Sequence, residues 1–176
     1  PFDRVTDAGG ALLAPGLINL HQHVQMNFSK GLAGGLRLEK WSVGLAAKTR
    51  DAMVWEDFAA SFRLGALEML RTGTTCFIEA GTILDLGAVA DGLAATGIRG
   101  RIGQWLQDRA FAPDDDQAVL TRSAIDRMVA QADAYPQADD ALIAAWPLLV
   151  GHNTATDDLW RAATDLARAR GLGVSA

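Results

Sequence analysis

Cysteine is almost absent from this 176-residue chain, in which Cys76 is the single example. One cysteine cannot form an internal disulfide, and it cannot build a zinc ribbon from paired CxxC motifs. The chain also lacks an uninterrupted apolar run of about 18 residues, the length that a membrane-spanning helix needs. No signal peptide is recognisable, so we expect a cytoplasmic protein with no membrane partner.

Positive charge is scarce as well. The chain has 16 Lys and Arg residues against 21 Asp and Glu residues, which gives a net charge of −5. This balance argues against a nucleic-acid partner, because binding to phosphates depends on clustered Lys and Arg. The sequence contains no HExxH, P-loop or GxSxG motif. The lone cysteine also excludes the zinc pattern of cytidine deaminases.

Short apolar segments alternate with amphipathic segments along the chain. We predict strands over residues 17–20, 74–79, 99–107 and 141–150, and the beginning of a fifth over 172–176. Predicted helices cover residues 52–71, 84–96, 117–135 and 157–170. This alternation predicts an α/β fold with a parallel sheet. An open doubly wound sheet and the first part of a TIM-type (β/α)₈ barrel, with about five of its strands, both fit the pattern.

Histidine is rare, and two of the three histidines form the sequence His21-Gln22-His23 at the carboxyl end of the first predicted strand. Residues two apart in an extended strand point to the same side, so both imidazoles can face one divalent cation. Such a pair also arises by chance as polar residues that leave a strand. Its place at the carboxyl end of a buried strand, where parallel α/β folds hold their active sites, favours a metal site.

Three segments, in chain order, carry a resemblance to a known family. They are APGLINLHQHVQMNFSKGLAGGLRLEKW, LGALEMLRTGTTCFIEAG and WPLLVGHNTATDDLWRAATDLARARGLGVSA. Together they resemble the amidohydrolase superfamily, in its branch of metal-dependent aminohydrolases that act on heterocycles. That branch includes adenosine-type, S-adenosylhomocysteine-type and guanine deaminases and the triazine chlorohydrolases. The resemblance implies a partial (β/α)₈ barrel over residues 14–176, with residues 1–13 as the edge of an N-terminal β-sandwich.

The resemblance also implies one divalent metal ion, with Zn²⁺ favoured over Fe²⁺. His21 and His23 match the ligands of the first barrel strand, and the family adds a histidine from strand five and an aspartate from strand eight. The ion lowers the pKa of its bound water, and a glutamate after strand five moves protons. Those three family residues would follow Ala176, so the catalytic residues are unknown. We therefore expect this sequence to be part of a longer polypeptide and not to be active alone.

Three further residues match positions that contact substrate in relatives. His152 matches a histidine in the loop after strand four, with bracing of that loop as the alternative. Glu39 lies where nucleoside-type deaminases bind sugar hydroxyls, although a solvated loop glutamate is the more ordinary interpretation. Met26 stands where guanine deaminases carry a glutamine, and a thioether cannot donate that hydrogen bond, so a guanine-like substrate is less expected. Glu79, at the end of a predicted strand, could face the pocket or form a salt bridge at the rim.

The function expected from this resemblance is the hydrolytic deamination of a small aminated heterocycle of purine, pterin, pyrimidine or triazine type. A triazine-type hydrolase that releases chloride or an alkylamine is the alternative within the enzymes. A non-catalytic scaffold with the same fold, and an open flavodoxin-like binding domain, are the alternatives outside them. A homo-oligomer is compatible with each of these.

Overall fold

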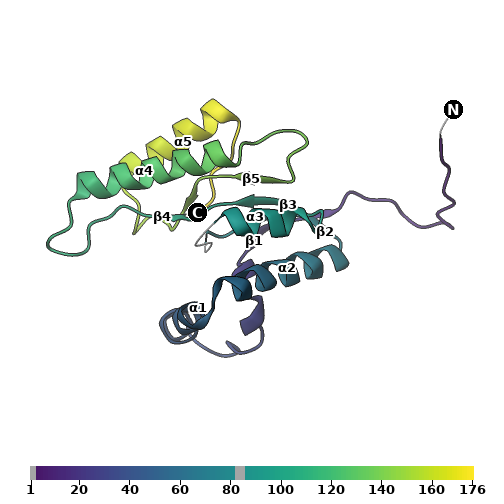
Figure 1. Ribbon diagram of the computed structural model, residues 1–176, viewed down its shortest axis with the longest axis horizontal. Helices are drawn as coiled ribbons and strands as arrows, with labels where there is room; N and C mark the ends of the chain where they lie inside the picture. Colours follow the sequence, from purple (N-terminus) through teal and green to yellow (C-terminus); the bar gives the residue numbers. More distant parts are fainter. Residues whose placement is uncertain (1–2, 82–85) are drawn as a thin grey trace.

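The computed structural model describes residues 3–81 and 86–176 (Figure 1). Its strands are β1 (Leu17–Gln22), β2 (Thr74–Glu79), β3 (Arg99–Ile102), β4 (Trp105–Leu106), β5 (Ile143–Ala145) and β6 (Leu148–Leu149). Its α-helices are α1 (Ala47–Ala52), α2 (Trp55–Arg71), α3 (Gly87–Ala94), α4 (Gln117–Ala134) and α5 (Asp157–Arg170). A 3₁₀ helix, η1 (Val24–Ser29), and a π-helix, η2 (Lys40–Ala46), lie between β1 and α1. The predicted alternation of strands and helices is confirmed.

The strands lie side by side in the order in which they occur along the chain. One sheet has the order β1-β2-β3-β5, and β4 pairs with β6 in a second, short sheet. Every pairing between these strands is parallel. In a doubly wound sheet the strand order reverses at a switch point, whereas successive barrel strands are neighbours. The sequential order therefore favours the first part of a barrel over the flavodoxin-like alternative, and the barrel is not closed within the described residues.

The predictions of continuous strands over 99–107 and 141–150 are wrong, because each segment is interrupted in its middle. Pro147 has no N–H group with which to continue the ladder. Gly103 lies against the same point, where an added Cβ would come within 2.7 Å of the Trp146 carbonyl oxygen. The close approach of two backbones and the missing donor end β3 and β5 early. Apolar composition does not reveal either effect.

Two other predicted elements also differ from the structure at their ends. The helix predicted over 52–71 is broken, because Met53 and Val54 are extended with ψ angles of 136° and 172°. Helix α2 then begins with the Asp57 carboxylate accepting a hydrogen bond from the Val54 N–H at 3.0 Å. The strand predicted over 172–176 appears as a single parallel bridge from Ser175 to Leu148.

The helices agree more closely with their predictions. Helix α3 lies inside the predicted 84–96 segment, of which residues 84 and 85 fall outside the described residues. Helix α5 starts at the predicted cap, because the Thr156 hydroxyl accepts a hydrogen bond from the Leu159 N–H at 3.3 Å. It ends at Gly171, whose φ of 65° is left-handed and suits glycine. None of the helices described here is long and apolar enough to cross a membrane.

Two apolar clusters hold the helices against the strands. The first lies between α2, α3 and the larger sheet, and its most buried large side chains are Phe62, Phe77, Leu93, Ile98 and Ile102. The second joins α4 and α5 to β4 and β6 through Leu106, Met128, Leu149 and Leu159. Figure 1 shows α4 and α5 side by side on one side of the strands and α2 towards the other. Burying each such side chain contributes about 1.5–3 kcal/mol.

Strand β1 is an open edge of the sheet. Its side chains Leu17, Ile18 and Leu20 are 64%, 63% and 67% exposed. Residues 3–16 form no strand and extend away from the rest of the chain in Figure 1. The assignment of residues 1–13 to the edge of a β-sandwich stays a prediction.

One buried carboxylate ties three elements together at the carboxyl end of the sheet. Asp108 follows β4, and its Oδ1 accepts a hydrogen bond from the Thr156 N–H at 2.7 Å. Its Oδ2 accepts from the hydroxyls of Thr121 and Thr156 at 2.6 and 2.5 Å. Hydrogen bonds to an ionised acceptor are roughly twice as strong as neutral ones. Asp108 therefore fixes the loop after β4 against α4 and the start of α5.

Replacing Asp108 by asparagine is expected to lower the free energy of unfolding by about 1–3 kcal/mol. The amide would turn an NH₂ group towards donors that now share a carboxylate. Urea denaturation followed by tryptophan fluorescence measures the change. Asp126→Asn, at an exposed position of α4, is the matched control and should change stability by less than about 0.5 kcal/mol. Equal effects of the two substitutions would contradict the role given to Asp108.

Candidate functional site

Polar side chains follow several strands at the same edge of the sheet. His21 and His23 lie at the end of β1, and Glu79 is the last residue of β2, paired with Gln22. Asp108 and His152 follow β4 and β6. Because the strands are parallel, their carboxyl ends meet at one rim. This rim is where barrels and open α/β sheets place their active sites.

The two imidazoles of the His21-Gln22-His23 segment lie next to each other. Their ring centroids are 5.0 Å apart, with an interplanar angle of 85°. With Zn–N bonds of about 2 Å and a tetrahedral angle, two coordinating imidazoles have centroids about 5 Å apart. Neither ring makes a hydrogen bond within residues 3–81 and 86–176, and His23 Nδ1 is buried without a partner. The pair therefore fits two ligands of one divalent ion.

The environment of His23 keeps its imidazole neutral. Burial lowers the pKa of His23 below its ordinary value of 6.5, and the neighbouring His21 lowers it further. Histidine binds metal in its neutral form, so protons compete less with a metal ion at neutral pH. The burial that disfavours the protonated ring thus leaves the neutral imidazole, which is the form that can bind a metal ion.

Two histidines alone do not make a catalytic zinc site. A catalytic zinc ion has three protein ligands and an open position for water or substrate. Among the described residues, no group of three or more His, Cys, Asp or Glu side chains could hold an ion. The described residues therefore offer at most the two imidazoles of His21 and His23 as a pair of ligands at this rim.

Two tryptophans lie beside His23. The ring centroid of His23 is 6.4 Å from that of Trp41 and 6.2 Å from that of Trp105. The Trp105 indole N–H donates a hydrogen bond to the carbonyl of Ala80, in the loop after β2. Gly81 has a φ of 86°, and an added Cβ would come within 2.1 Å of the Trp105 ring. A glycine is required there for Trp105 to reach its place beside the histidine.

Glu79 holds the same loop. Its carboxylate is fully buried, and Oε2 accepts a hydrogen bond from the Gly81 N–H at 2.6 Å. The Ala80 N–H donates to the Gln22 carbonyl at 2.9 Å, which joins the loop to β1. The structure thus places Glu79 beneath the rim, where it fixes the backbone that supports Trp105.

A cavity of about 280 Å³ lies against the two tryptophans. Its lining includes Gln25, Met26, Trp41, Ser42, Arg50 and Trp105. Met26 lines this cavity, whereas His21 and His23 do not, and its role as a substrate contact stays a prediction. Gln25 and Arg50 were not found from the sequence. The spacing of Ser42, Ala46 and Arg50, four residues apart, was the available signal for one helical face.

Glu39 and His152 lie apart from this cavity. Glu39 is exposed at the start of η2, where its carbonyl accepts a hydrogen bond from the Ser42 hydroxyl at 3.4 Å. His152 is exposed and stacks on Trp160, with ring centroids 5.1 Å apart and an interplanar angle of 23°. Neither lines the 280 Å³ cavity. Their roles in substrate binding stay predictions.

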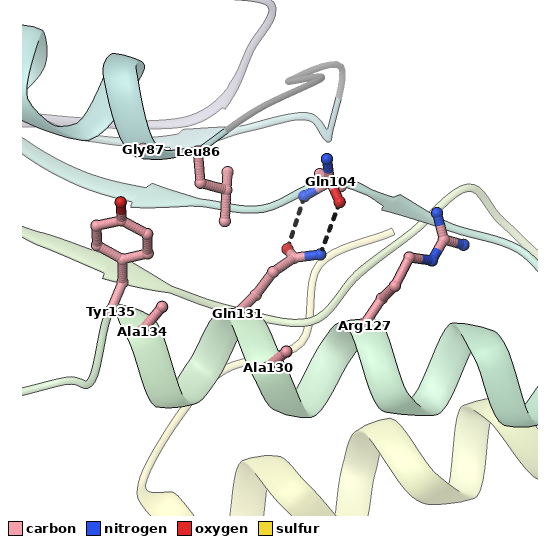
Figure 2. A pocket seen from close by; sticks show the side chains of 8 residues that line it. All are labelled: Leu86, Gly87, Gln104, Arg127, Ala130, Gln131, Ala134 and Tyr135. Carbon is pink, nitrogen blue, oxygen red and sulfur yellow. Dashed lines mark hydrogen bonds between the residues drawn. The ribbon is translucent and has the colours of Figure 1, made fainter.

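Figure 2 shows a second, larger cavity of about 540 Å³ between α3 and α4. Gln131 reaches from α4 to Gln104 and accepts from its backbone N–H at 2.9 Å, while the Gln131 amide donates to Gln104 Oε1 at 3.1 Å. None of the histidines lines this cavity. This cavity lies where α4 packs against the residues that link β3 to β4.

The profile described as "Amidohydrolase family" matches residues 12–176 of this chain. The 5-methylthioadenosine/S-adenosylhomocysteine deaminase of Nitratidesulfovibrio vulgaris is 32% identical over 170 residues, which are 97% of this chain and 37% of that protein. The enzyme of the same name from Halobacterium salinarum is 33% identical over 123 residues, 68% of this chain and 28% of that protein. The chain thus spans about a third of the length of these curated relatives.

Solved structures agree with the barrel assignment. An adenosine deaminase from Xanthomonas campestris with bound zinc has a TM-score of 0.69 and 26% identity, over 91% of this chain and 35% of that one. A triazine hydrolase from Arthrobacter aurescens has a TM-score of 0.72 and 18% identity, over 91% and 39%. At this lower identity the second likeness concerns the fold alone.

In the metal-free protein, His23 is expected to titrate below 6.5. Replacing His21 by glutamine should raise the His23 pKa, because the second cause of the shift is removed while burial remains. Stability should fall as the pH drops below 6.5, because the unfolded chain binds a proton there more readily than the folded one. NMR titration of histidine ring carbons measures both variants. His152→Gln is the control and should leave His23 unchanged, and titration of His23 above 6.5 would rule out the proposed environment.

Proposed function

This chain belongs to the amidohydrolase family, and we propose that it supplies two metal ligands and part of the substrate pocket of an aminohydrolase. The enzyme would remove an amino group from a small heterocycle. The observation that carries the proposal is the histidine pair, with ring centroids 5.0 Å apart and a buried His23 nitrogen that has no hydrogen-bond partner in the described part of the chain. The neighbouring aromatic cavity supplies a place for a flat ring.

The reaction is a substitution by water at a ring carbon. Water adds to the carbon that carries the amino group, the C–N bond breaks, and the products are ammonia and the ring carbonyl compound. A bound divalent ion would supply water with a pKa near neutrality. His21 and His23 would hold that ion, and the burial of His23 keeps its ring unprotonated. Trp41 and Trp105 would exclude bulk water and contact the faces of the ring.

Deamination is favoured over the release of another leaving group. The relatives at 32–33% identity are named as deaminases, whereas the triazine hydrolase is 18% identical. Zinc is the favoured ion, because two imidazoles suit it and the adenosine deaminase from X. campestris has zinc bound. A triazine-type hydrolase that releases chloride or an alkylamine is the second candidate, supported by the similarity in fold. A non-catalytic scaffold would have no need of two unpartnered imidazoles at this rim.

The test compares metal content and product release in the purified protein that carries these residues. His21→Ala/His23→Ala is expected to lose its stoichiometric metal and more than about 100-fold in ammonia release, because loss of outer-shell partners alone costs about 10–100-fold. Elemental analysis and an ammonia assay measure the two effects. The substrate panel is adenosine, S-adenosylhomocysteine, guanine and a chlorinated triazine.

His152→Ala is the matched control, since it removes an imidazole from the same rim and should keep the metal. Chloride release without ammonia would favour the triazine-type alternative. A folded double variant that keeps one equivalent of zinc would refute the assignment of these ligands.

A further inference from the structure

The 280 Å³ cavity beside His23 has one helical wall of small side chains. Ser42, Ala46 and Ala47 line it from η2 and α1, and Arg50 follows one turn later on α1. Trp105 and Met26 face it from other elements. Small residues leave the space open, and its volume lies just below the range of about 300–1,000 Å³ that is usual for ligand pockets. The cavity suits a compound of one or two rings.

Among the residues that the structure describes, Arg50 is the only ionisable one that lines this cavity. Its guanidinium has one partner among the described residues, the adjacent Asp51, at 3.3 Å. The two side chains are 45% and 69% exposed. Exposed pairs of this kind contribute little, so the guanidinium is available to a ligand. Its planar fork matches a carboxylate through two parallel hydrogen bonds.

Gln25 gives the same cavity a second polar feature. The residue is 6% exposed, and its Oε1 is buried without a hydrogen-bond partner in the described part of the chain. A buried acceptor without a partner is unfavourable, so one is normally satisfied by water or a ligand. An N–H or amino group of a heterocycle would satisfy it once the Gln25 amide turns towards the cavity that its side chain lines.

Trp41 and Trp105 connect this cavity to the histidine pair, because they line the cavity and also lie 6.4 and 6.2 Å from the His23 ring centroid. Neither histidine lines the cavity itself, so a ring bound there would approach the pair along these tryptophans. The edge of the ring away from the pair would lie towards α1, which carries Arg50.

We propose that Arg50 selects heterocycles that carry a carboxylate, and that Gln25 binds an N–H group of the same ring. Turnover of such a compound depends on the proposed function, and the inference adds the class of substrate that the proposed deaminase site would accept. An acidic substituent would distinguish such a substrate from the uncharged bases and nucleosides.

The experiment uses the full-length metal-loaded protein and two probes that differ only in the substituent opposite the amino group, 2-aminopyrimidine-5-carboxylate and 2-aminopyrimidine-5-carboxamide. The carboxylate should have a kcat/KM at least about tenfold higher, as hydrogen bonds between charged groups would give. Arg50→Gln should remove this preference by lowering the carboxylate value towards the carboxamide value. Gln25→Leu should lower both values without changing their ratio.

Lys48→Gln is the matched control, because it removes one positive charge from α1 at a position outside the cavity. It should keep the preference, and thermal melting should show that all variants are folded. A preference that persists in Arg50→Gln, or its absence in the unmodified protein, would overturn the inference.

A binding measurement separates this inference from the proposed function. Pyrimidine-5-carboxylate has no amino group to lose, so calorimetry follows its binding without turnover. Binding that Arg50→Gln weakens at least about tenfold, with no ammonia from any probe, would support the carboxylate site and count against deamination. Ammonia release with equal binding of the acid and the amide would leave deamination standing and refute the role of Arg50.

Discussion

The place of the histidine pair depends on the hydrogen bonding of β1 to β2, which continues to the last residue of both strands. Gln22 pairs with Glu79, and the Ala80 N–H donates to the Gln22 carbonyl at 2.9 Å. The register shifts between Asn19 and Gln22, so the regular ladder is interrupted beside His21. The Asn19 side chain compensates by accepting a hydrogen bond from the His21 N–H at 3.1 Å. Strand β1 thus brings both imidazoles to the rim, and the hydrogen bond from His21 to the Asn19 side chain compensates for its register shift.

The loop after β2 connects the end of that strand to Trp105. Glu79 accepts from the Gly81 N–H, and the carbonyl of Ala80 accepts from the Trp105 indole. Trp105 then lies against His23, and the burial of that imidazole lowers its pKa. Backbone geometry, aromatic packing and the protonation state of His23 are therefore linked through three consecutive residues. Under the proposed function, a change in this loop would act on metal binding without touching either histidine.

The sequence was sufficient for the features that depend on local pattern. Strand β2 and helix α4 agree with their predicted ranges within one residue, because their apolar spacing and flanking signals are strong. The interruptions at Gly103 and Pro147 were missed, since they arise where two strands meet. The histidine pair could be predicted because both residues lie within three positions at the carboxyl end of β1. Gln25 and Arg50 could not, because their shared cavity exists only when η1, η2 and α1 pack together beside β4.

Under the proposed function, completion of the metal site and completion of the sheet would be physically coupled. Leu17, Ile18 and Leu20 leave β1 with an apolar, unpaired edge, which native sheets normally cover. A parallel strand added at that edge would bury these side chains and bring its own carboxyl end next to His21. A ligand carried there would join the histidine pair at the same rim. Metal affinity would then include the free energy of burying the β1 edge, and the bound ion would in turn stabilise the closed sheet.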